Sequence, residues 1–118
     1  MSNTSTHICT FEIYCIKPAH KEWQKLDNTI REVFLKKLIK LINNPRIEKN
    51  RLRGQLSDCY KIKLQYLGYR LVYQVIDNKV MLLIWAIDKR QNEDVYDGAK
   101  NRLKTYQSDP NPIKLELE

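Results

Sequence analysis

The sequence predicts a single α+β domain. One strand and two helices come first, and three consecutive strands and a last short helix follow them. The 118 residues are enough for one core between a sheet and a few helices. The domain is expected to span residues 1–118, with a folded core from about residue 7 to residue 104 and a flexible polar tail over residues 105–118.

The first strand and the two helices can be placed from local signals. Residues 7–16 are rich in strand-forming residues, with apolar side chains at alternate positions. Pro18 is suited to open a short helix. A capping cluster at residues 27–29 precedes apolar residues at helical spacing, and this second helix is expected to end at Asn43-Asn44-Pro45, because the residue before a proline disfavours helix.

The second half of the chain predicts most of the sheet. A polar, basic connector over residues 46–58 leads to three strands, expected at residues 59–64, 69–76 and 79–88. The last of these strands is apolar on both faces, so it is expected to be central in the sheet. Residues 93–104 carry apolar side chains on one side and predict a terminal helix.

Three basic residues are expected on one face of the first two of these strands. Lys61 and Lys63 alternate with apolar residues, so they share one face of their strand. If the turn uses residues 65–68, either as a four-residue loop or with Gln65 paired to Gly68, Lys63 lies opposite Arg70. Like charges directly across a strand pair destabilise a sheet. An anionic ligand such as an RNA phosphate would explain this pairing, whereas fold stability alone would not.

The overall charge agrees with an anionic ligand without requiring one. The formal net charge is +7 and the pI is near 9.4, but many soluble basic proteins bind nothing acidic. The distribution is more informative, because residues 45–70 hold seven Lys and Arg against two acidic residues, which is five of the seven net charges. A concentrated excess of this kind suits contact with RNA.

Several classes of protein are excluded. No run of eighteen apolar residues and no secretion signal is present, so we expect a cytoplasmic protein with no membrane partner. The three cysteines do not suggest a disulfide framework. Neither a metal site nor a cofactor is expected, because there is no CxxC motif and His7 and His20 lack ligand-like spacing.

The segments described above resemble a known family, the RelE toxins of bacterial toxin-antitoxin pairs. The resemblance rests on HKEWQKLDNTIREVFLKKLIKLINNPRIEKNRLRG, on DCYKIKLQYLGYRLVYQVIDNKVMLLIWAIDKRQNEDVY and on ANR, in family order over roughly residues 11–103. It implies two N-terminal helices packed on a four-stranded, mainly antiparallel sheet with a short C-terminal helix. Residues after Lys104 extend beyond the family pattern.

The resemblance also implies an activity and partners. The implied activity is cleavage of messenger RNA in the A site of the translating 70S ribosome, which inhibits translation. The implied partner is a RelB-like antitoxin, with operator DNA contacted only through that antitoxin. The family's active site is a cluster of basic residues and a tyrosine, which fall here on Lys61, Lys63, Arg70, Arg90 and Tyr96. RNA contact is linked in the family to Arg53, and we expect it also at Arg46, Lys49, Arg51 and Lys89.

Cleavage of RNA by its own 2′-hydroxyl needs a base, a proton donor for the leaving 5′-oxygen, and positive charge around the phosphate. A lysine can act as a base only when it is neutral, and neighbouring cations favour the neutral form. Our hypothesis makes Lys63 the base, with Lys61 and Arg70 on the phosphate. Arg90 would lie near the leaving oxygen as a stabiliser or proton donor, and Tyr96 would stack on a base or orient the 2′-hydroxyl.

Other interpretations stay open from the sequence. Taken alone, Lys61 and Lys63 are better explained as a solvated strand face, Arg90 as a cap of the sheet edge, and Tyr96 as a core residue. Two rival functions also remain. One is a gyrase-poisoning toxin on the same fold, a branch that lacks this set of lysines and arginines, and the other is an RNA-binding module without catalysis.

Overall fold

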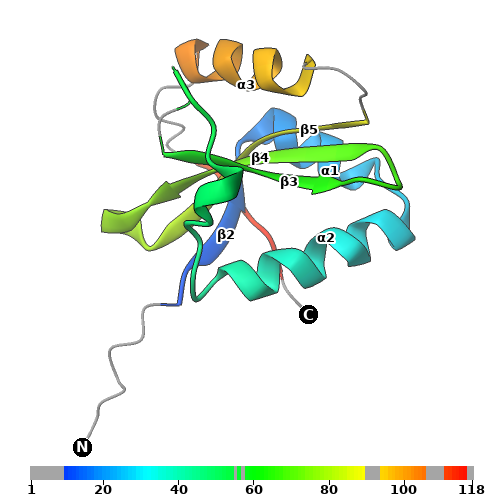
Figure 1. Ribbon diagram of the computed structural model, residues 1–118, viewed down its shortest axis with the longest axis horizontal. Coiled ribbons are helices and arrows are strands. Elements are labelled where there is room, and N and C mark those ends of the chain that lie inside the picture. The colour runs from blue at the N-terminus through cyan, green and yellow to red at the C-terminus, as the bar shows by residue number, and fades with distance from the viewer. Residues whose placement is uncertain (1–9, 55, 57, 90–93, 106–110, 117–118) are drawn as a thin grey trace, which may run out of the picture.

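The computed structural model describes residues 10–54, 56, 58–89, 94–105 and 111–116 (Figure 1). Within these residues, three helices accompany one five-stranded sheet with the strand order β3-β4-β5-β2-β6. The strands are β2 (Glu12–Cys15), β3 (Cys59–Leu64), β4 (Tyr69–Ile76), β5 (Met81–Lys89) and β6 (Ile113–Lys114). The helices are α1 (Lys17–Gln24), α2 (Asn28–Leu41) and α3 (Asp94–Thr105), with short 3-10 turns η1 (Glu48–Asn50) and η2 (Asp77–Lys79).

The predicted α+β class is confirmed, but the predicted four-stranded, mainly antiparallel sheet is wrong in part. β2 pairs with β5 in parallel, with Glu12 opposite Met81. Parallel neighbours need a long crossover between them, and here the crossover contains α1, α2, β3 and β4. Because so many elements intervene, no turn in the sequence reveals the direction of this pairing.

The second difference is the fifth strand. Residues 113–114 were expected in a flexible tail, yet they form β6, which pairs antiparallel with β2. The Leu115 N–H donates to the Ile13 carbonyl at 2.8 Å, and Leu115 is buried. Without β6, β2 would carry an unpaired edge of backbone donors and acceptors. The prolines around this segment and its place near the end of the sequence hid the strand.

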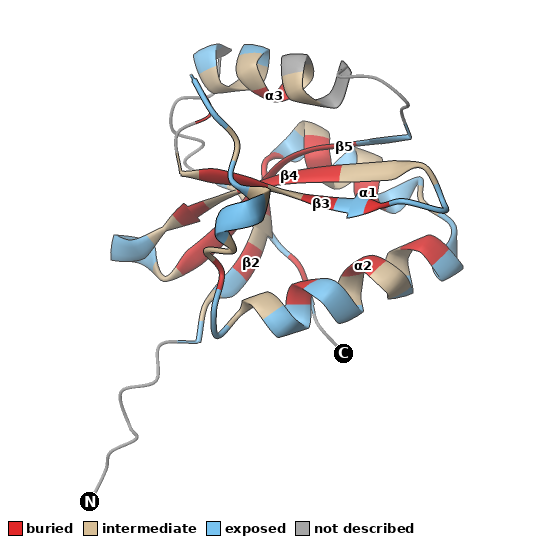
Figure 2. Cartoon of the chain, viewed as in Figure 1, coloured by how far each residue is buried: buried red, intermediate tan, exposed pale blue. Residues whose placement is uncertain are grey.

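β5 is the centre of the sheet, as predicted. Its residues from Met81 to Ile87 are all buried, which agrees with a strand that has neighbours on both sides and covered faces. α2 and α3 lie on opposite faces of the sheet, and much of the sheet between them consists of buried residues (Figures 1 and 2). Of the strand predicted at residues 7–16, the described residues 10, 11 and 16 lie outside β2, and residues 7–9, with His7 and Cys9, lie outside the described part of the chain.

α1 follows β2 and lies along the second half of β5, where β2 has already ended. Glu22 of α1 accepts the Ile87 N–H at 3.0 Å, so a side chain replaces the missing neighbour strand. Arg102 of α3 donates to both oxygens of Glu22 at 2.8 and 2.9 Å and to the Trp85 carbonyl at 3.0 Å. This arrangement closes the open edge of β5 and joins α3 to α1. No helix among the described residues is long and apolar enough to span a membrane.

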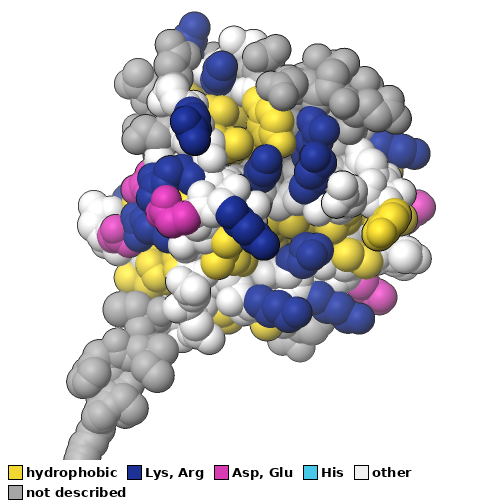
Figure 3. Space-filling model, viewed as in Figure 1, with side chains coloured by type: hydrophobic (Ala, Val, Ile, Leu, Met, Phe, Trp, Pro, Cys, Tyr) yellow, Lys and Arg dark blue, Asp and Glu magenta, His cyan; other side chains and the backbone are white. Residues whose placement is uncertain are grey.

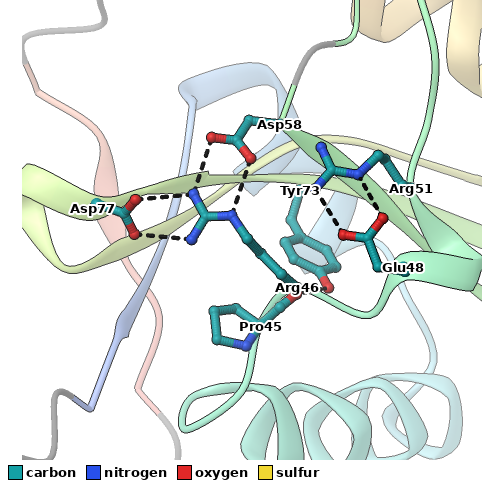
Figure 4. A network of polar contacts seen from close by, with 7 residues as sticks. All are labelled: Pro45, Arg46, Glu48, Arg51, Asp58, Tyr73 and Asp77. Atoms are coloured by element: carbon teal, nitrogen blue, oxygen red, sulfur yellow. Dashed lines mark hydrogen bonds and ion pairs between the residues drawn. The ribbon is translucent and has the colours of Figure 1, made fainter.

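The basic connector is held in place by Arg46 (Figure 4). Its guanidinium donates to both carboxylate oxygens of Asp58, at 3.1 and 3.0 Å, and to both of Asp77, at 3.0 Å each. Asp58 immediately precedes β3, and Asp77 begins the turn between β4 and β5. Pro45 accepts a hydrogen bond from the buried Tyr73 hydroxyl at 2.7 Å. These contacts fix the start of the connector against the sheet.

The end of the connector lies on the edge of β3. Arg51 forms an isolated antiparallel bridge with Tyr60, and the Leu52 N–H donates to the Cys59 carbonyl at 2.9 Å. The Arg51 guanidinium also lies 5.1 Å from the centre of the Tyr60 ring and pairs with Glu48 at 2.8 Å. Thus the connector covers only the beginning of the β3 edge, and β3 is otherwise an edge strand of the sheet.

Replacing Arg46 with alanine should destabilise the fold. The two carboxylates would lose their common donor, and the partly exposed pair with Asp58 contributes up to about 1 kcal/mol after allowance for solvent. Urea unfolding followed by circular dichroism measures the loss. Lys49→Ala is the matched control on the same connector, and an equal loss in both variants would contradict this role of Arg46.

The contribution of Asp77 should depend on pH. Hydrogen bonds from Arg46 hold the pKa of the Asp77 carboxyl below its usual range in the folded protein. The stabilisation is therefore fully present above the ordinary aspartate pKa of about 4 and is lost as the pH falls through the lower folded value. Asp77→Asn should be less stable than the unmodified protein at pH 7, and the difference should shrink below about pH 4. Stability measured from pH 7 to pH 3 tests this, and a constant difference would contradict it.

Candidate active site

The β3–β4 hairpin sets the geometry of the basic cluster. Lys63 pairs directly with Arg70, as predicted for a turn over residues 65–68. The Leu64 carbonyl accepts the N–H groups of Leu67 and Gly68 at 3.1 and 2.8 Å, so the turn is the four-residue form over residues 65–68. Gly68 closes this turn with a φ of +75°, a conformation that other residues rarely adopt.

Lys61 and Lys63 lie on the side of β3 that faces away from the core. Their strand neighbours Tyr60, Ile62 and Leu64 are buried, whereas Lys61 is half-buried and Lys63 is exposed. Because side chains alternate along a strand, both lysines share the sheet face of Arg70. β3 is an edge strand, so a ligand can also approach these side chains from beside the sheet.

Tyr96 joins this cluster from α3. The Arg70 guanidinium lies 5.6 Å from the centre of the Tyr96 ring, which is a distance for a cation–π contact. Tyr96 is half-buried, and so it is neither a purely core residue nor a free surface residue. The structure therefore brings Lys61, Lys63, Arg70 and Tyr96 together, whereas Arg90 lies outside the described residues.

An acidic residue that the sequence did not reveal lies on the other side of Arg70. Asp88 of β5 is directly opposite Arg70, so Arg70 has Lys63 across one strand and Asp88 across the other. An opposite charge at such a position offsets the repulsion between Lys63 and Arg70. The pairing of Arg70 with Asp88 could not be predicted from the sequence, because the register of β4 and β5 shifts by one residue between Val72 and Tyr73. Counting from the β4–β5 turn therefore gives the wrong partner.

A groove of about 690 Å³ runs along the same edge of the molecule, between α2, η1 and β3. All of its charged lining residues are lysines, and we call it the lysine groove: Lys37, Lys40, Lys49, Lys61 and Lys63. Figure 3 shows Lys and Arg side chains gathered over this face. Five ammonium groups around one concavity create a positive potential that favours a polyanion. The sequence did not single out Lys37 and Lys40, because only the tertiary fold brings α2 beside β3.

The remaining expected RNA contacts are placed differently from one another. Lys49 lines the lysine groove, and Arg53 is exposed on the connector. The guanidinium groups of Arg46 and Arg51 instead have carboxylate partners within the fold. The exposed Lys89 lies with its ammonium 5.7 Å from the centre of the Tyr69 ring. The structure thus assigns a structural role to Arg46 and Arg51, whatever else they contact.

Other reactive groups do not form a second centre among the described residues. Cys15 and Cys59 are buried, and burial raises the pKa of each thiol to about 12, which leaves both protonated at neutral pH. Groups of three or more His, Cys, Asp or Glu that could hold a metal ion do not occur in the described part of the chain. The chemistry that the described residues offer is that of ammonium and guanidinium groups, a tyrosine and one nearby carboxylate.

Comparisons with known proteins agree with this description. A family model described as the ParE toxin of the type II toxin-antitoxin system, parDE, matches residues 16–93. The mRNA interferase toxin RelE of Escherichia coli K12 is 53% identical over 85 residues, which cover 72% of this chain and 88% of that protein.

Solved structures with a similar fold also come from RelE. A free double-arginine mutant of E. coli RelE has a TM-score of 0.72 and 47% identity, and the match covers 80% of this chain and 98% of that one. The toxin in the intact E. coli RelBE toxin-antitoxin complex has a TM-score of 0.65 and 49% identity, covering 70% of this chain and 99% of that one. From the family model and the identity to RelE, the chain belongs to the RelE family of toxins of type II toxin-antitoxin systems.

Proposed function

We propose that this protein is the toxin of a toxin-antitoxin pair and an endoribonuclease that cuts messenger RNA in the A site of the 70S ribosome. The proposal depends on the pairing of Lys63 with Arg70, whose guanidinium contacts the Tyr96 ring. Lys63 lies on the edge strand β3, which also lines the lysine groove. A relative that is 53% identical is named an mRNA interferase toxin, which supports the same activity. A toxin that acts on translating ribosomes would work in the cytoplasm.

The positions of the side chains support one proposed reaction. The 2′-hydroxyl of one nucleotide attacks its own 3′-phosphate, and Lys63 takes the hydroxyl proton. Lys61 and Arg70 lie on the same sheet face and hold the phosphate while its negative charge grows. Tyr96, in contact with Arg70, orients the 2′-hydroxyl or stacks on a base. Arg90 remains the proposed group at the leaving 5′-oxygen.

In the proposed reaction, the ribosome would align the message for attack. Lysine and arginine are weak acid–base catalysts at neutral pH, so precise alignment of the message has to supply much of the rate. The decoding site would hold the RNA in a reactive geometry, and the lysine groove would bind neighbouring phosphates of the message or of ribosomal RNA. Arg53 and Lys89 are proposed to add to these contacts.

A RelB-like antitoxin is the proposed natural partner. The solved E. coli complex contains RelE with its antitoxin RelB. For this chain, a disordered antitoxin segment that orders on the domain would cover or distort the basic cluster and so prevent RNA entry. Operator DNA would be contacted only through the antitoxin.

One rival function is favoured by a specific observation. The family model that matches residues 16–93 describes the ParE toxin. A gyrase-poisoning toxin on the same fold is therefore the second candidate function. The paired Lys63 and Arg70 have no evident use in that activity, but they suit a phosphate. We therefore place RNA cleavage first and gyrase poisoning second.

Lys63→Ala should reduce cleavage of ribosome-bound messenger RNA by roughly 100-fold or more, because general base catalysis contributes about that much. Primer extension on messages in purified ribosomes measures the cuts, with parallel reactions that lack ribosomes. Lys79→Ala, an exposed lysine in the turn between β4 and β5, is the control that should cut at the normal rate.

The same assay separates the candidate functions. Cuts that require ribosomes support the proposal, and unchanged cleavage by Lys63→Ala would remove Lys63 as the base. Gyrase-dependent DNA breaks without RNA cuts would favour the ParE-like activity, and binding to ribosomes without cuts would favour a non-catalytic RNA-binding module.

The lysine groove should contribute affinity that depends on salt. Lys37→Ala combined with Lys40→Ala removes two positive charges from the groove, so the slope of log affinity for ribosomes against log salt should become shallower by roughly one to two units. Filter binding at several salt concentrations measures this slope. Lys36→Ala changes an exposed lysine of the same helix that does not line the groove, and an equal change of slope there would contradict the assignment.

A further inference from the structure

The tip of the β3–β4 hairpin exposes apolar surface directly beside the basic cluster. Tyr66 has a relative exposure of 102% and Leu67 of 38%, and both lie in the turn that follows Lys63 and Leu64. A tyrosine this exposed contributes almost nothing to the hydrophobic core. An exposed aromatic ring next to a cationic site is instead a common feature of surfaces that bind single-stranded RNA.

A second, smaller groove lies between this turn and α2. It has a volume of about 300 Å³, and we call it the tip groove, with lining residues Val33, Lys37, Lys63, Leu64, Gln65, Tyr66 and Leu67. Its walls are mainly apolar, and its two charged lining residues, Lys37 and Lys63, are both cations. An apolar groove with a few polar groups is the usual form of a site for a small organic group.

The tip groove is continuous with the lysine groove. Lys37, Lys63 and Gln65 line both of them, so a ligand that follows the lysines along β3 reaches Tyr66 next. Lys63 is also the residue proposed to act on the scissile nucleotide. A nucleotide adjacent to that one would therefore have its phosphate near Lys37 and its base near the Tyr66 ring.

We propose that Tyr66, together with the apolar wall of the tip groove, is a stacking site for the base of an unpaired RNA nucleotide adjacent to the cleaved linkage. This inference rests on the proposed function, which supplies the RNA. The Lys37 ammonium of the groove complements a phosphate, and the exposed ring offers a flat face that any base can cover. An RNA nucleotide thus satisfies both halves of the site, the charged and the apolar.

Stacking also has a consequence for sequence preference. Stacking strength, rather than a hydrogen-bond pattern, sets the preference of such sites. Purines have the larger aromatic surface, so a purine at the position that meets Tyr66 should be favoured over a pyrimidine. The site would contribute to the choice of cleaved sequence without reading any base edge.

The test compares variants of the full chain on ribosome-bound messages and on a short single-stranded RNA. Tyr66→Ala should raise KM roughly five- to tenfold with little change in kcat, because a base–aromatic stack of modest strength is lost. Tyr66→Phe keeps the ring and should restore the normal KM. Ile39→Ala removes another exposed apolar residue, on α2 outside the tip groove, and should change neither constant.

A direct readout accompanies the kinetics. RNA with one 2-aminopurine base should lose fluorescence on binding the unmodified protein and Tyr66→Phe, but much less on binding Tyr66→Ala. The salt dependence of binding should be the same in Tyr66→Ala as in the unmodified protein, since no charge is removed. This combination separates a stacking role from an electrostatic or purely structural one.

The outcomes distinguish the inference from the function on which it rests. An unchanged KM and unchanged quenching in Tyr66→Ala, with normal cleavage by the unmodified protein, would overturn the stacking site alone. Weaker binding of the antitoxin with unchanged RNA binding would also overturn it and assign Tyr66 to that partner. Tyr66-dependent quenching by a protein that cuts no RNA would support the stacking site and overturn the proposed endoribonuclease.

Discussion

The antiparallel pairing of β3 with β4 is the constraint on which the rest of the site depends. It places Lys63 opposite Arg70, and a slip of one residue would turn the lysines of β3 into the core. Burial of the intervening apolar side chains makes such a slip costly, and the four-residue turn closed by Gly68 fixes the count. Arg51 of the connector pairs with Tyr60 near the start of β3, and the hydrogen bonds of Arg46 to Asp58 and Asp77 hold the start of the connector against the sheet. Fold stability and site geometry thus share the same contacts.

The charges of the molecule divide into two groups with different tasks. Arg46, Arg51 and Arg102 pair with carboxylates and fasten segments that are distant in the sequence. The lysines of the lysine groove have no carboxylate among the groove's lining residues, so they present their charge to a ligand. Guanidinium groups suit the first task because they bind carboxylates bidentately, and ammonium groups suit the second as mobile point charges. Asp88 belongs to neither group, because it lies opposite Arg70 in the sheet and offsets its charge.

Local patterns predicted the parts of the site that lie close in the sequence. Alternation along β3 and the length of one turn were enough for the register of Lys63 with Arg70, and apolar runs were enough for a central β5. Four other features depend on contacts between distant segments and could not be predicted in this way. Two of them belong to the sheet, the parallel β2–β5 pair and the strand β6. The others are the approach of Lys37 and Lys40 to β3 and the ion pairs of Arg46 with Asp58 and Asp77. The position of Asp88 failed for a different reason, since one irregular residue pair in β4 and β5 shifts the count.

We propose that Lys63 of β3 and Arg70 of β4 together promote attack by the 2′-hydroxyl of a bound message. The ends of the cleaved message report on this step, because the attack leaves a 2′,3′-cyclic phosphate on the upstream fragment and a 5′-hydroxyl on the downstream one. We predict these ends within the A-site codon of messages cut on the ribosome. A 3′-hydroxyl and a 5′-phosphate at the cut, which result when water attacks and the bond from phosphorus to the 3′-oxygen breaks, would show that the 2′-hydroxyl is not the nucleophile.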